Sequence, residues 1–286
     1  GILSPSLLAS FVLLGIFPLI AKKIVDVVKA NKVLRSYPKP KHFDRDVVVI
    51  GAGSGGLVAA LIVATVKGKV TLIEKHKMGG DCLNTGCVPS KSLIRSAKLV
   101  HDMHRGEALG MRSQKLEFDF ASVMDRVQRI VKTIEPHDSV ERYESLGVDC
   151  EMGVGKILSP YEVEVNGKVI TTKNIIVAAG AGPLVPPIKG IDQVEYLTSD
   201  NLWEIREQPK NLVVLGGGPI GTELSQAFNR LGTKVTQVEA LDRILSREDP
   251  EISKMMMDRL EDEGVNIQTA TMATAVASTN MMPPAA

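Results

Sequence analysis

A strand, a glycine-rich turn, a helix and a second strand succeed one another near residue 50. Residues 46–50 (DVVVI) form an almost wholly apolar run, which is typical of a strand in a buried parallel sheet. A turn at 51–56 (GAGSGG) follows, then an Ala-rich apolar segment at 57–66 and a second strand at 69–74 (KVTLIE). This pattern predicts a βαβ unit with the glycine turn between its first strand and its helix.

The same succession recurs in the second half of the chain. It consists of a strand, a turn, a helix and a strand at 211–215, 216–221 (GGGPIG), 222–231 and 234–239. In both copies a glutamate ends the second strand at the same distance from the first glycine of the turn, Glu74 after Gly51 and Glu239 after Gly216. The two copies predict an α/β protein with two Rossmann-like nucleotide-binding domains.

Two helices and a β-rich segment separate the copies. Helical periodicity is clearest at 91–104 and 120–146. The β-rich segment contains predicted strands at 148–157, 162–165, 168–171 and 174–179. Asn166-Gly167 lies between two of these strands and is typical of a type I′ turn. We therefore expect a β-hairpin or meander inserted in the first nucleotide-binding domain.

The amino-terminal residues differ from the rest of the chain because positions 1–21 carry no charge. The apolar stretch 7–21 has fifteen residues, fewer than the about 20 that a membrane-spanning helix needs. Basic residues follow from Lys22 onward, along an expected amphipathic helix that ends near residue 33 and a linker with two prolines at 37–42. We predict a membrane-associated apolar helix with the following residues on the cytoplasmic side, and a buried helix or interfacial anchor is the alternative.

These patterns divide the chain into a membrane-associated helix with a basic linker at 1–43, a first nucleotide-binding domain at 44–200 and a second at 201–286. The last part is shorter than the about 100–150 residues expected of such a domain, so we expect it to be incomplete. The chain opens with Gly1 rather than Met, which indicates a fragment that continues upstream. The formal net charge of +1 leaves no basic excess to neutralise phosphates and argues against a nucleic-acid partner.

Each glycine turn is suited to a dinucleotide. The first glycine permits the tight turn, the second lets a pyrophosphate approach the backbone, and the third lets the helix pack closely on the strand. These glycines are Gly51, Gly53 and Gly56 in the first copy and Gly216, Gly218 and Gly221 in the second. Glu74 and Glu239 are then placed to accept hydrogen bonds from ribose hydroxyls. The Glu239 carboxylate would repel a 2′-phosphate, which favours NADH over NADPH, although Arg243 and Arg247 are near enough in the sequence to serve a phosphate.

Cys82 and Cys87 are the most distinctive chemical feature, in the segment 79–91 (GGDCLNTGCVPSK). They lie at the start of a helical stretch, where a helix dipole lowers thiol pKa values and favours the thiolate. Three cysteines are too few for a secreted disulfide scaffold, so the pair indicates catalysis in a reducing compartment. A metal site would need further Cys or His ligands at suitable spacing, and we predict none. An inert buried pair is the other alternative, and Cys150 is expected in the core.

The two glycine motifs, their glutamates, the CxxxxC-VPSK segment and GGGPIGxE together resemble the class I pyridine nucleotide-disulfide oxidoreductases. Residues 79–98 are most similar to the mercuric reductase and dihydrolipoamide dehydrogenase branch, and the resemblance covers roughly 44–270. An apolar segment ahead of such a reductase also resembles bacterial fusions to a TVP38/DedA-like membrane domain.

The resemblance implies that the first glycine motif binds the FAD pyrophosphate, Glu74 the adenosine ribose, and Gly155 the adenine through its backbone. It implies that the second motif and Glu239 hold NADH. In the family the second cysteine, here Cys87, lies against the flavin and forms a charge-transfer thiolate, and the first, here Cys82, attacks the substrate.

Lys91 matches the family lysine near flavin N5, which pairs with the glutamate after the second glycine motif, here Glu223. A cation beside N5 stabilises negative charge on the reduced flavin, and the carboxylate keeps the ammonium in place. Asp81 stands where the family usually has Thr, and 178–180 reads AAG in place of ATG. The family's C-terminal dimerisation domain, with its His-Pro base, lies outside these 286 residues, and a homodimer is expected of the full-length parent.

We predict an NAD(P)H- and FAD-dependent oxidoreductase that passes hydride through FAD to the Cys82–Cys87 disulfide and on to a disulfide or metal-ion substrate. Mercuric ion, lipoamide, a small disulfide and a protein disulfide stay open as substrates. The expected location is the cytoplasmic face of the membrane or the cytoplasm. The alternatives are a membrane-tethered NADH dehydrogenase that reduces quinone, for which Cys82 is dispensable, and a catalytically incomplete fragment.

Overall fold

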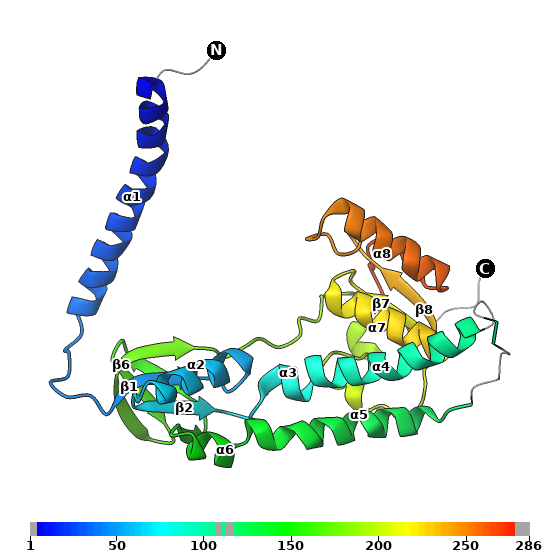
Figure 1. The fold of residues 1–286 in the computed structure, drawn as a ribbon, viewed down its shortest axis with the longest axis horizontal. Coiled ribbons are helices and arrows are strands. Elements are labelled where there is room, and N and C mark those ends of the chain that lie inside the picture. The colour runs from blue at the N-terminus through cyan, green and yellow to red at the C-terminus, as the bar shows by residue number, and fades with distance from the viewer. Residues whose placement is uncertain (1–4, 107–109, 112–116, 278–286) are drawn as a thin grey trace. The chain divides into compact units, whose positions relative to one another are not determined.

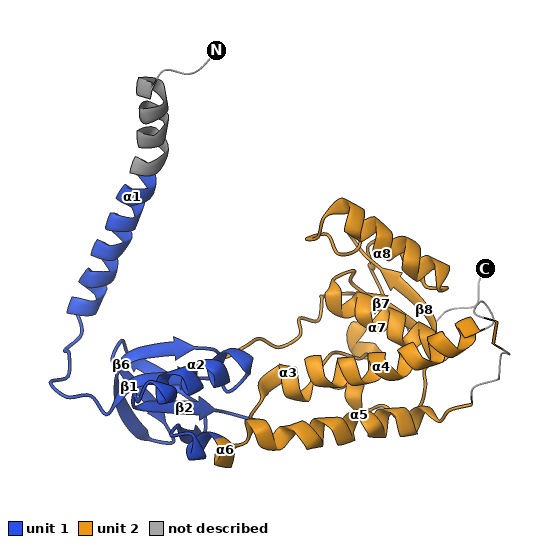
Figure 2. Ribbon diagram, in the orientation of Figure 1, with its two compact units in different colours: residues 1–76, 143–178 blue, residues 77–142, 179–286 orange. Residues whose placement is uncertain are grey.

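The chain forms two compact units in a computed structural model that describes residues 5–106, 110–111 and 117–277, with side chains from residue 18 onward. Unit 1 comprises residues 1–76 and 143–178, and unit 2 comprises residues 77–142 and 179–286 (Figure 2). These bounds differ from the predicted division at residues 44 and 200, because residues 77–142 pack with the second half of the chain. The assignment of the predicted domains to FAD and NAD(P) stays a prediction.

Unit 1 contains a six-stranded mixed sheet in the order β3-β2-β1-β6-β5-β4, of which β1, β2 and β6 are labelled in Figure 1. Its strands are β1 Arg45–Ile50, β2 Val70–Glu74, β3 Asp149–Met152, β4 Lys156–Ser159, β5 Glu162–Val165 and β6 Lys168–Val177. The pairs β3-β2, β2-β1 and β1-β6 are parallel, whereas β6-β5 and β5-β4 are antiparallel. The parallel part has the 3-2-1-4 order of a Rossmann fold, and the antiparallel part is the predicted meander.

Local sequence explains the central strands and the hairpin of unit 1. Val48 and Val49 of β1 are fully buried, as expected of a continuous apolar run between two neighbouring strands. Helix α2 Ser54–Thr65 joins β1 to β2 and begins directly after the glycine turn. Asn166 and Gly167 both have positive φ angles, 51° and 79°, which is the conformation that a type I′ turn requires. The predicted hairpin is confirmed.

Helix α1 Pro5–Arg35 precedes the sheet. It includes the amphipathic helix expected to end near residue 33, and its exposed apolar side chains include Leu19, Ile24 and Val28. Most of the predicted apolar stretch 7–21 lies outside the residues whose side chains are described. Within the described part of the chain, no helix combines the length and the apolar character needed to cross a membrane.

Unit 2 combines helices with a three-stranded parallel sheet in the order β7-β8-β9. Its elements are α3 Gly80–Asn84, α4 Cys87–His104, α5 Phe120–Ile134, η2 Glu135–Asp138, η3 Ile191–Gln193, η4 Leu202–Glu204, β7 Asn211–Leu215, α7 Pro219–Arg230, β8 Lys234–Val238, α8 Pro250–Asp262 and β9 Asn266–Gln268. The short helix α6 Val140–Ser145 leads from unit 2 into unit 1. The parallel order of β7, β8 and β9 is that of half a Rossmann fold.

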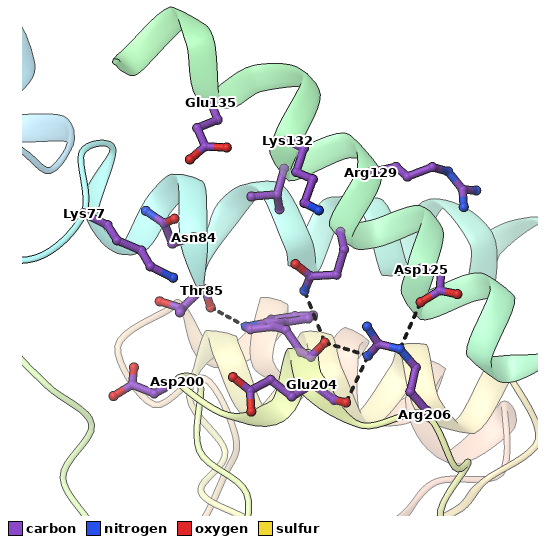
Figure 3. Close-up of a pocket in the computed structure, with 13 residues that line it drawn as sticks. Lys77, Asn84, Thr85, Asp125, Arg129, Lys132, Glu135, Asp200, Glu204 and Arg206 are labelled. Carbon is purple, nitrogen blue, oxygen red and sulfur yellow. Dashed lines mark hydrogen bonds and ion pairs between the residues drawn. The ribbon is translucent and has the colours of Figure 1, made fainter. Parts of the chain in front are cut away.

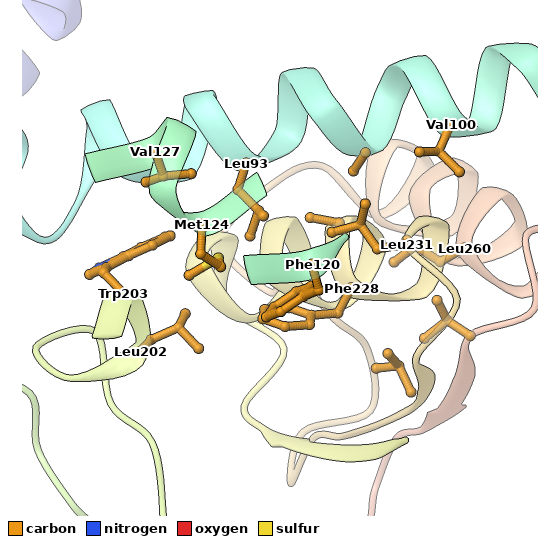
Figure 4. Packing of buried hydrophobic residues seen from close by; sticks show 14 of the residues in the cluster. Leu93, Val100, Phe120, Met124, Val127, Leu202, Trp203, Phe228, Leu231 and Leu260 are labelled. Atoms are coloured by element: carbon orange, nitrogen blue, oxygen red, sulfur yellow. The ribbon is translucent and has the colours of Figure 1, made fainter. Parts of the chain in front are cut away.

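One hydrophobic core holds the helices of unit 2 together (Figure 4). Phe120 and Met124 of α5 lie one helical turn apart on its buried face, and the ring of Phe120 contacts that of Phe228 of α7 at a centroid distance of 6.1 Å. Leu93 of α4 is fully buried in the same cluster. Residues 77–142 therefore belong to unit 2 through apolar contacts with α7.

The structure corrects three predictions of secondary structure. The helix expected over 120–146 ends at Ile134, because Pro136 lacks the N–H that would continue the ladder, and the chain forms a 3-10 turn there. The strand expected over 148–157 is divided into β3 and β4, with Gly153 and Gly155 between them. The two strands expected at 168–171 and 174–179 are instead one long strand, β6.

Candidate functional site

The first glycine turn lies between β1 and α2 in unit 1. Gly51 has a φ of 102°, a backbone conformation that residues other than glycine rarely adopt. A Cβ on Gly56 would lie 1.7 Å from the carbonyl oxygen of Gly51, so only glycine permits this contact of turn and helix. Gly53 precedes the first residue of α2 and has no side chain to cap it. The amides of the first helical turn are therefore free to meet an anion.

Glu74 ends β2 and joins the two ends of the βαβ unit. Its Oε2 accepts a hydrogen bond from the N–H of Ala52 at 2.7 Å, and its Oε1 accepts one from His76 at 2.8 Å. A carboxylate has about four acceptor positions, so each oxygen keeps one for a ribose hydroxyl. Glu74 thus holds the turn in shape and fits the predicted nucleotide.

Gly155 lies at the same edge of the sheet. A Cβ there would approach the side chain of Ile73 to 3.3 Å and that of Ile50 to 3.4 Å, and these residues lie at or next to the carboxyl ends of β2 and β1. Ligands of open α/β sheets bind beyond the carboxyl ends of the strands. The structure therefore brings Gly155, Glu74 and the first glycine turn together within unit 1.

The second glycine turn, in unit 2, repeats this geometry. Gly216 has a φ of 111°, and a Cβ on Gly221 would lie 2.3 Å from the Gly216 oxygen. The N–H of Gly217 donates to Oε2 of Glu239, and that of Leu241 donates to Oε1 at 2.8 Å. Gly218 precedes α7 as Gly53 precedes α2. Both turns therefore fit a bound dinucleotide, and in each the glutamate carboxylate is held by hydrogen bonds from backbone N–H groups.

The cysteine loop, residues 82–87, comprises the end of α3, the connecting residues Thr85 and Gly86, and the first residue of α4 in unit 2. Cys87 is the first residue of α4 and is exposed, while Cys82 is half-buried, and both are free thiols. The Asn84 amide donates to the carbonyls of Met78 at 3.0 Å and Gly80 at 2.9 Å, which ties the loop to the segment before it.

The two thiols of the loop interact directly. A side-chain hydrogen bond to Cys82 raises the pKa of the Cys87 thiol, burial raises it further, and the charge of Lys91 acts in the opposite direction. The expected lowering of the pKa at the helix start is not met for Cys87 in the dithiol, because the bond to Cys82 stabilises the protonated Cys87 thiol and burial disfavours its thiolate. Burial raises the pKa of Cys150, in β3, to about 11, which fits a structural thiol.

Lys91 and Glu223 form an ion pair. Lys91 follows Cys87 by one turn on α4, and Glu223 lies on α7. The Lys91 Nζ lies 2.9 Å and 2.7 Å from the two carboxylate oxygens of Glu223. The side chains are 61% and 40% exposed, so the pair adds little to stability and serves to position the ammonium.

The predicted site residues fall into two sets. Unit 1 contains the first glycine motif, Glu74 and Gly155, and unit 2 contains the cysteine loop, the Lys91–Glu223 pair and the second motif with Glu239. Each set is brought together within its unit. Among the residues that the structure describes, no group of three or more His, Cys, Asp or Glu side chains is arranged to hold a metal ion.

Two features of unit 2 escaped the sequence analysis. The indole of Trp203 donates a hydrogen bond to the carbonyl of Thr85, inside the cysteine loop, at 2.8 Å. Glu263, after α8, is a buried carboxylate that binds Arg230 and Arg259. Trp203 is the single tryptophan of the chain, which is the only sequence signal that would have singled it out.

Comparison with known proteins gives consistent matches. Residues 45–282 match the sequence model of the family described as pyridine nucleotide-disulphide oxidoreductase. The chain is 35% identical over 228 residues to a mercuric reductase of Bacillus cereus, covering 80% of this chain and 36% of that protein. It is 36% identical over 229 residues to a dihydrolipoyl dehydrogenase of Acholeplasma laidlawii, covering 78% of this chain and 68% of that protein.

Solved structures agree. The HOCl-induced flavoprotein disulfide reductase RclA from Escherichia coli, in its Cu(II) complex, matches with a TM-score of 0.68 and 29% identity over 80% of this chain and 50% of that chain. This chain thus spans about half of that protein and 36% of the Bacillus cereus relative. The family match begins at residue 45, so it gives no support to the predicted fusion with a TVP38/DedA-like membrane domain.

Proposed function

Because the chain belongs to the pyridine nucleotide-disulphide oxidoreductase family, we propose that it supplies the nucleotide-binding and thiol parts of a flavin-dependent disulfide oxidoreductase. The single observation that carries the proposal is the placement of Cys82 in α3 and Cys87 at the start of α4, with Cys87 one turn before a lysine held by Glu223. When bound, FAD supplies the two-electron relay between a nicotinamide and this pair.

Residues of unit 1 would hold the FAD. The amides at the start of α2 would bind its pyrophosphate, and the remaining acceptor positions of Glu74 would bind ribose hydroxyls. Gly155, at the same sheet edge, would meet the adenine through its backbone. Lys91, held by Glu223, would supply positive charge to the reduced flavin.

The thiols have separate roles. Cys87 would serve as the charge-transfer thiolate when FAD is bound, and Cys82 would exchange with the substrate. The hydrogen bond with Cys82 and burial raise the pKa of the Cys87 thiol in the dithiol, and the positive charge of Lys91 acts in the opposite direction.

The second turn selects the reductant. The Glu239 carboxylate would accept hydrogen bonds from ribose hydroxyls and would repel a 2′-phosphate, so NADH is favoured over NADPH. Arg243, near in sequence, donates to the carbonyl of Ser246 at 2.8 Å and is in part occupied. The substrate is a disulfide or a metal ion, and the relatives named mercuric reductase and dihydrolipoyl dehydrogenase span both classes.

A thiol count tests the proposal. The 286-residue chain is loaded with FAD, oxidised, and treated with NADH without oxygen, and free thiols are alkylated and counted by mass spectrometry. In the wild type and in Cys150→Ser, NADH is expected to convert the Cys82–Cys87 disulfide into two free thiols and to produce a long-wavelength absorbance band. Neither the two additional thiols nor the band is expected in Cys87→Ser. A thiol count that NADH leaves unchanged in the wild type overturns the proposal.

Three finer points are part of the same proposal. Residues 1–43 associate with a membrane surface, the parent protein is a homodimer, and it works in the cytoplasm or on the cytoplasmic face of a membrane. Vesicle flotation of the chain with and without residues 1–43 tests the first point, and the molar mass of the full-length parent in solution tests the second.

A further inference from the structure

Trp203 connects the segment before β7 to the cysteine loop. Trp203 lies in η4 and is only 3% exposed. Its Nε1–H donates a hydrogen bond of 2.8 Å to the carbonyl of Thr85, which lies 118 residues earlier in the sequence. Both residues line a cavity of about 700 Å³ in unit 2, where the bond is drawn as a dashed line (Figure 3). A buried indole N–H needs such an acceptor.

Helix α5 helps to hold Trp203 in place. The backbone carbonyl of Trp203 accepts hydrogen bonds from the Gln128 amide, on α5, and from the Arg206 guanidinium, both at 3.2 Å. The Arg206 Nε in turn donates to Asp125 of α5 at 2.9 Å. The indole also packs in the core of unit 2 (Figure 4). The donor is therefore fixed by groups that lie outside the cysteine loop.

The other hydrogen bonds around the loop are local. The N–H of Thr85 donates to the Asp81 carbonyl at 2.9 Å, and Asn84 binds the carbonyls of Met78 and Gly80. These bonds join the loop to its own neighbours in the sequence. The bond from Trp203 ties its middle to the rest of unit 2.

We propose that Trp203 is a positioning residue for the redox pair, which rests on the proposed function of Cys82 and Cys87. The structure shows the Trp203–Thr85 bond with both cysteines as free thiols. A disulfide confines the loop covalently, and the same bond then adds less. Loss of the indole N–H weakens the dithiol form more than the disulfide form, and the pair becomes easier to oxidise.

Equilibration with glutathione measures this shift. Oxidised glutathione loses its S–S bond, the Cys82–Cys87 bond forms, and the two thiol protons and the electron pair end on two reduced glutathione molecules. The ratio of disulfide to dithiol is read by alkylation and mass spectrometry at several glutathione ratios.

Two variants remove the donor. Trp203→Phe keeps an aromatic ring, and replacement of Trp203 by benzothienylalanine puts sulfur in place of the N–H while keeping the shape of the indole. Each is expected to shift the equilibrium about fivefold toward the disulfide, the effect of one hydrogen bond. Gln208→Met is the matched control, because it removes a side-chain bond of the same kind, to the Leu231 carbonyl at 2.7 Å, elsewhere in unit 2.

The outcomes separate the two proposals. A shift of less than about twofold in the benzothienylalanine protein, or an equal shift in Gln208→Met, overturns the role of Trp203 and leaves the proposed function standing. A wild type that forms no Cys82–Cys87 disulfide at any glutathione ratio overturns both. Fluorescence of the single tryptophan that changes with oxidation in the wild type adds support, since it reports on this site alone.

Discussion

Glu263 is the buried carboxylate that joins three helices of unit 2, and its replacement by glutamine should be strongly destabilising. Its side chain is 4% exposed. Arg230 of α7 donates to both carboxylate oxygens at 2.7 Å, and Arg259 of α8 donates to one at 2.7 Å. His101 of α4 lies 3.9 Å away. Glu263→Gln keeps the size of the side chain and removes its charge.

The expected loss follows from the burial of the partners. The Arg230 side chain is 12% exposed and loses its counter-charge, whereas Arg259, at 45%, turns toward water. Leaving a buried charge without its partner costs about 3–5 kcal/mol in the free energy of unfolding. Burial acts to raise the pKa of Glu263, but hydrogen bonds and positive charge from Arg230, with His101 and Arg259, outweigh it and lower that pKa.

A lowered pKa fixes the sign of the pH dependence. The stability that Glu263 contributes is present above its ordinary pKa of 4.5 and is lost as the pH falls through its lower folded value. The loss of wild-type stability in acid should therefore be smaller in Glu263→Gln.

Urea denaturation at pH 7 measures the effect against a control on the same helix. Asp258→Asn breaks the exposed pair with Lys254, whose atoms lie 2.7 Å apart, and should cost no more than about 0.5 kcal/mol. If Glu263→Gln loses no more stability than Asp258→Asn, the buried cluster does not hold the helices together and the reasoning fails.

Three further predictions concern the turns and the histidine. Gly56→Ala places a Cβ 1.7 Å from the Gly51 oxygen and should lower the free energy of unfolding by about 3 kcal/mol or more and abolish flavin binding. In Gly55→Ala the new Cβ has nothing within 4 Å, so this variant should be neutral or slightly stabilising. Thermal denaturation and flavin absorbance test both variants. Glu239→Ser should raise the affinity for NADPH relative to NADH about tenfold by removing a like charge, and calorimetric titration with an unchanged ratio would contradict this. Burial lowers the pKa of His101; the positive charges of Arg230, Arg259 and Arg105 lower it further, whereas the charge of Glu263 raises it. The contribution of His101 to stability therefore falls as the pH drops below 6.5. In His101→Gln the free energy of unfolding should depend less on pH between pH 7 and 5, and an unchanged slope would refute this.

Local signals in the sequence were enough for the elements around the two glycine turns. The apolar run 46–50 is typical of a buried parallel strand, and the glycines and the pair Asn166-Gly167 tolerate the positive φ angles that their turns require, so strand, turn and hairpin follow from a few neighbouring residues. The expectation of a single helix over 120–146 was wrong, because the apolar period continues through Pro136 although its missing N–H ends the helix there.

Contacts between distant residues depend on how the elements pack. The pairing of Lys91 with Glu223 was expected only from a resemblance, and the structure does place the two together on α4 and α7. No spacing in the sequence indicates that Trp203 donates to Thr85, or that Glu263 is buried between two arginines. The pKa of Cys87 illustrates the same limit, because it depends on where the thiol of Cys82 comes to lie.

The sequence by itself therefore determined the βαβ units and their glycine turns, since these rest on backbone constraints and residue types within a short segment. Tertiary structure alone decided that residues 77–142 pack with the second half of the chain, and which buried groups hold the cysteine loop. The physical reason is that burial and hydrogen bonding between distant segments are properties of the packed core, and that core forms only when several helices close on it together.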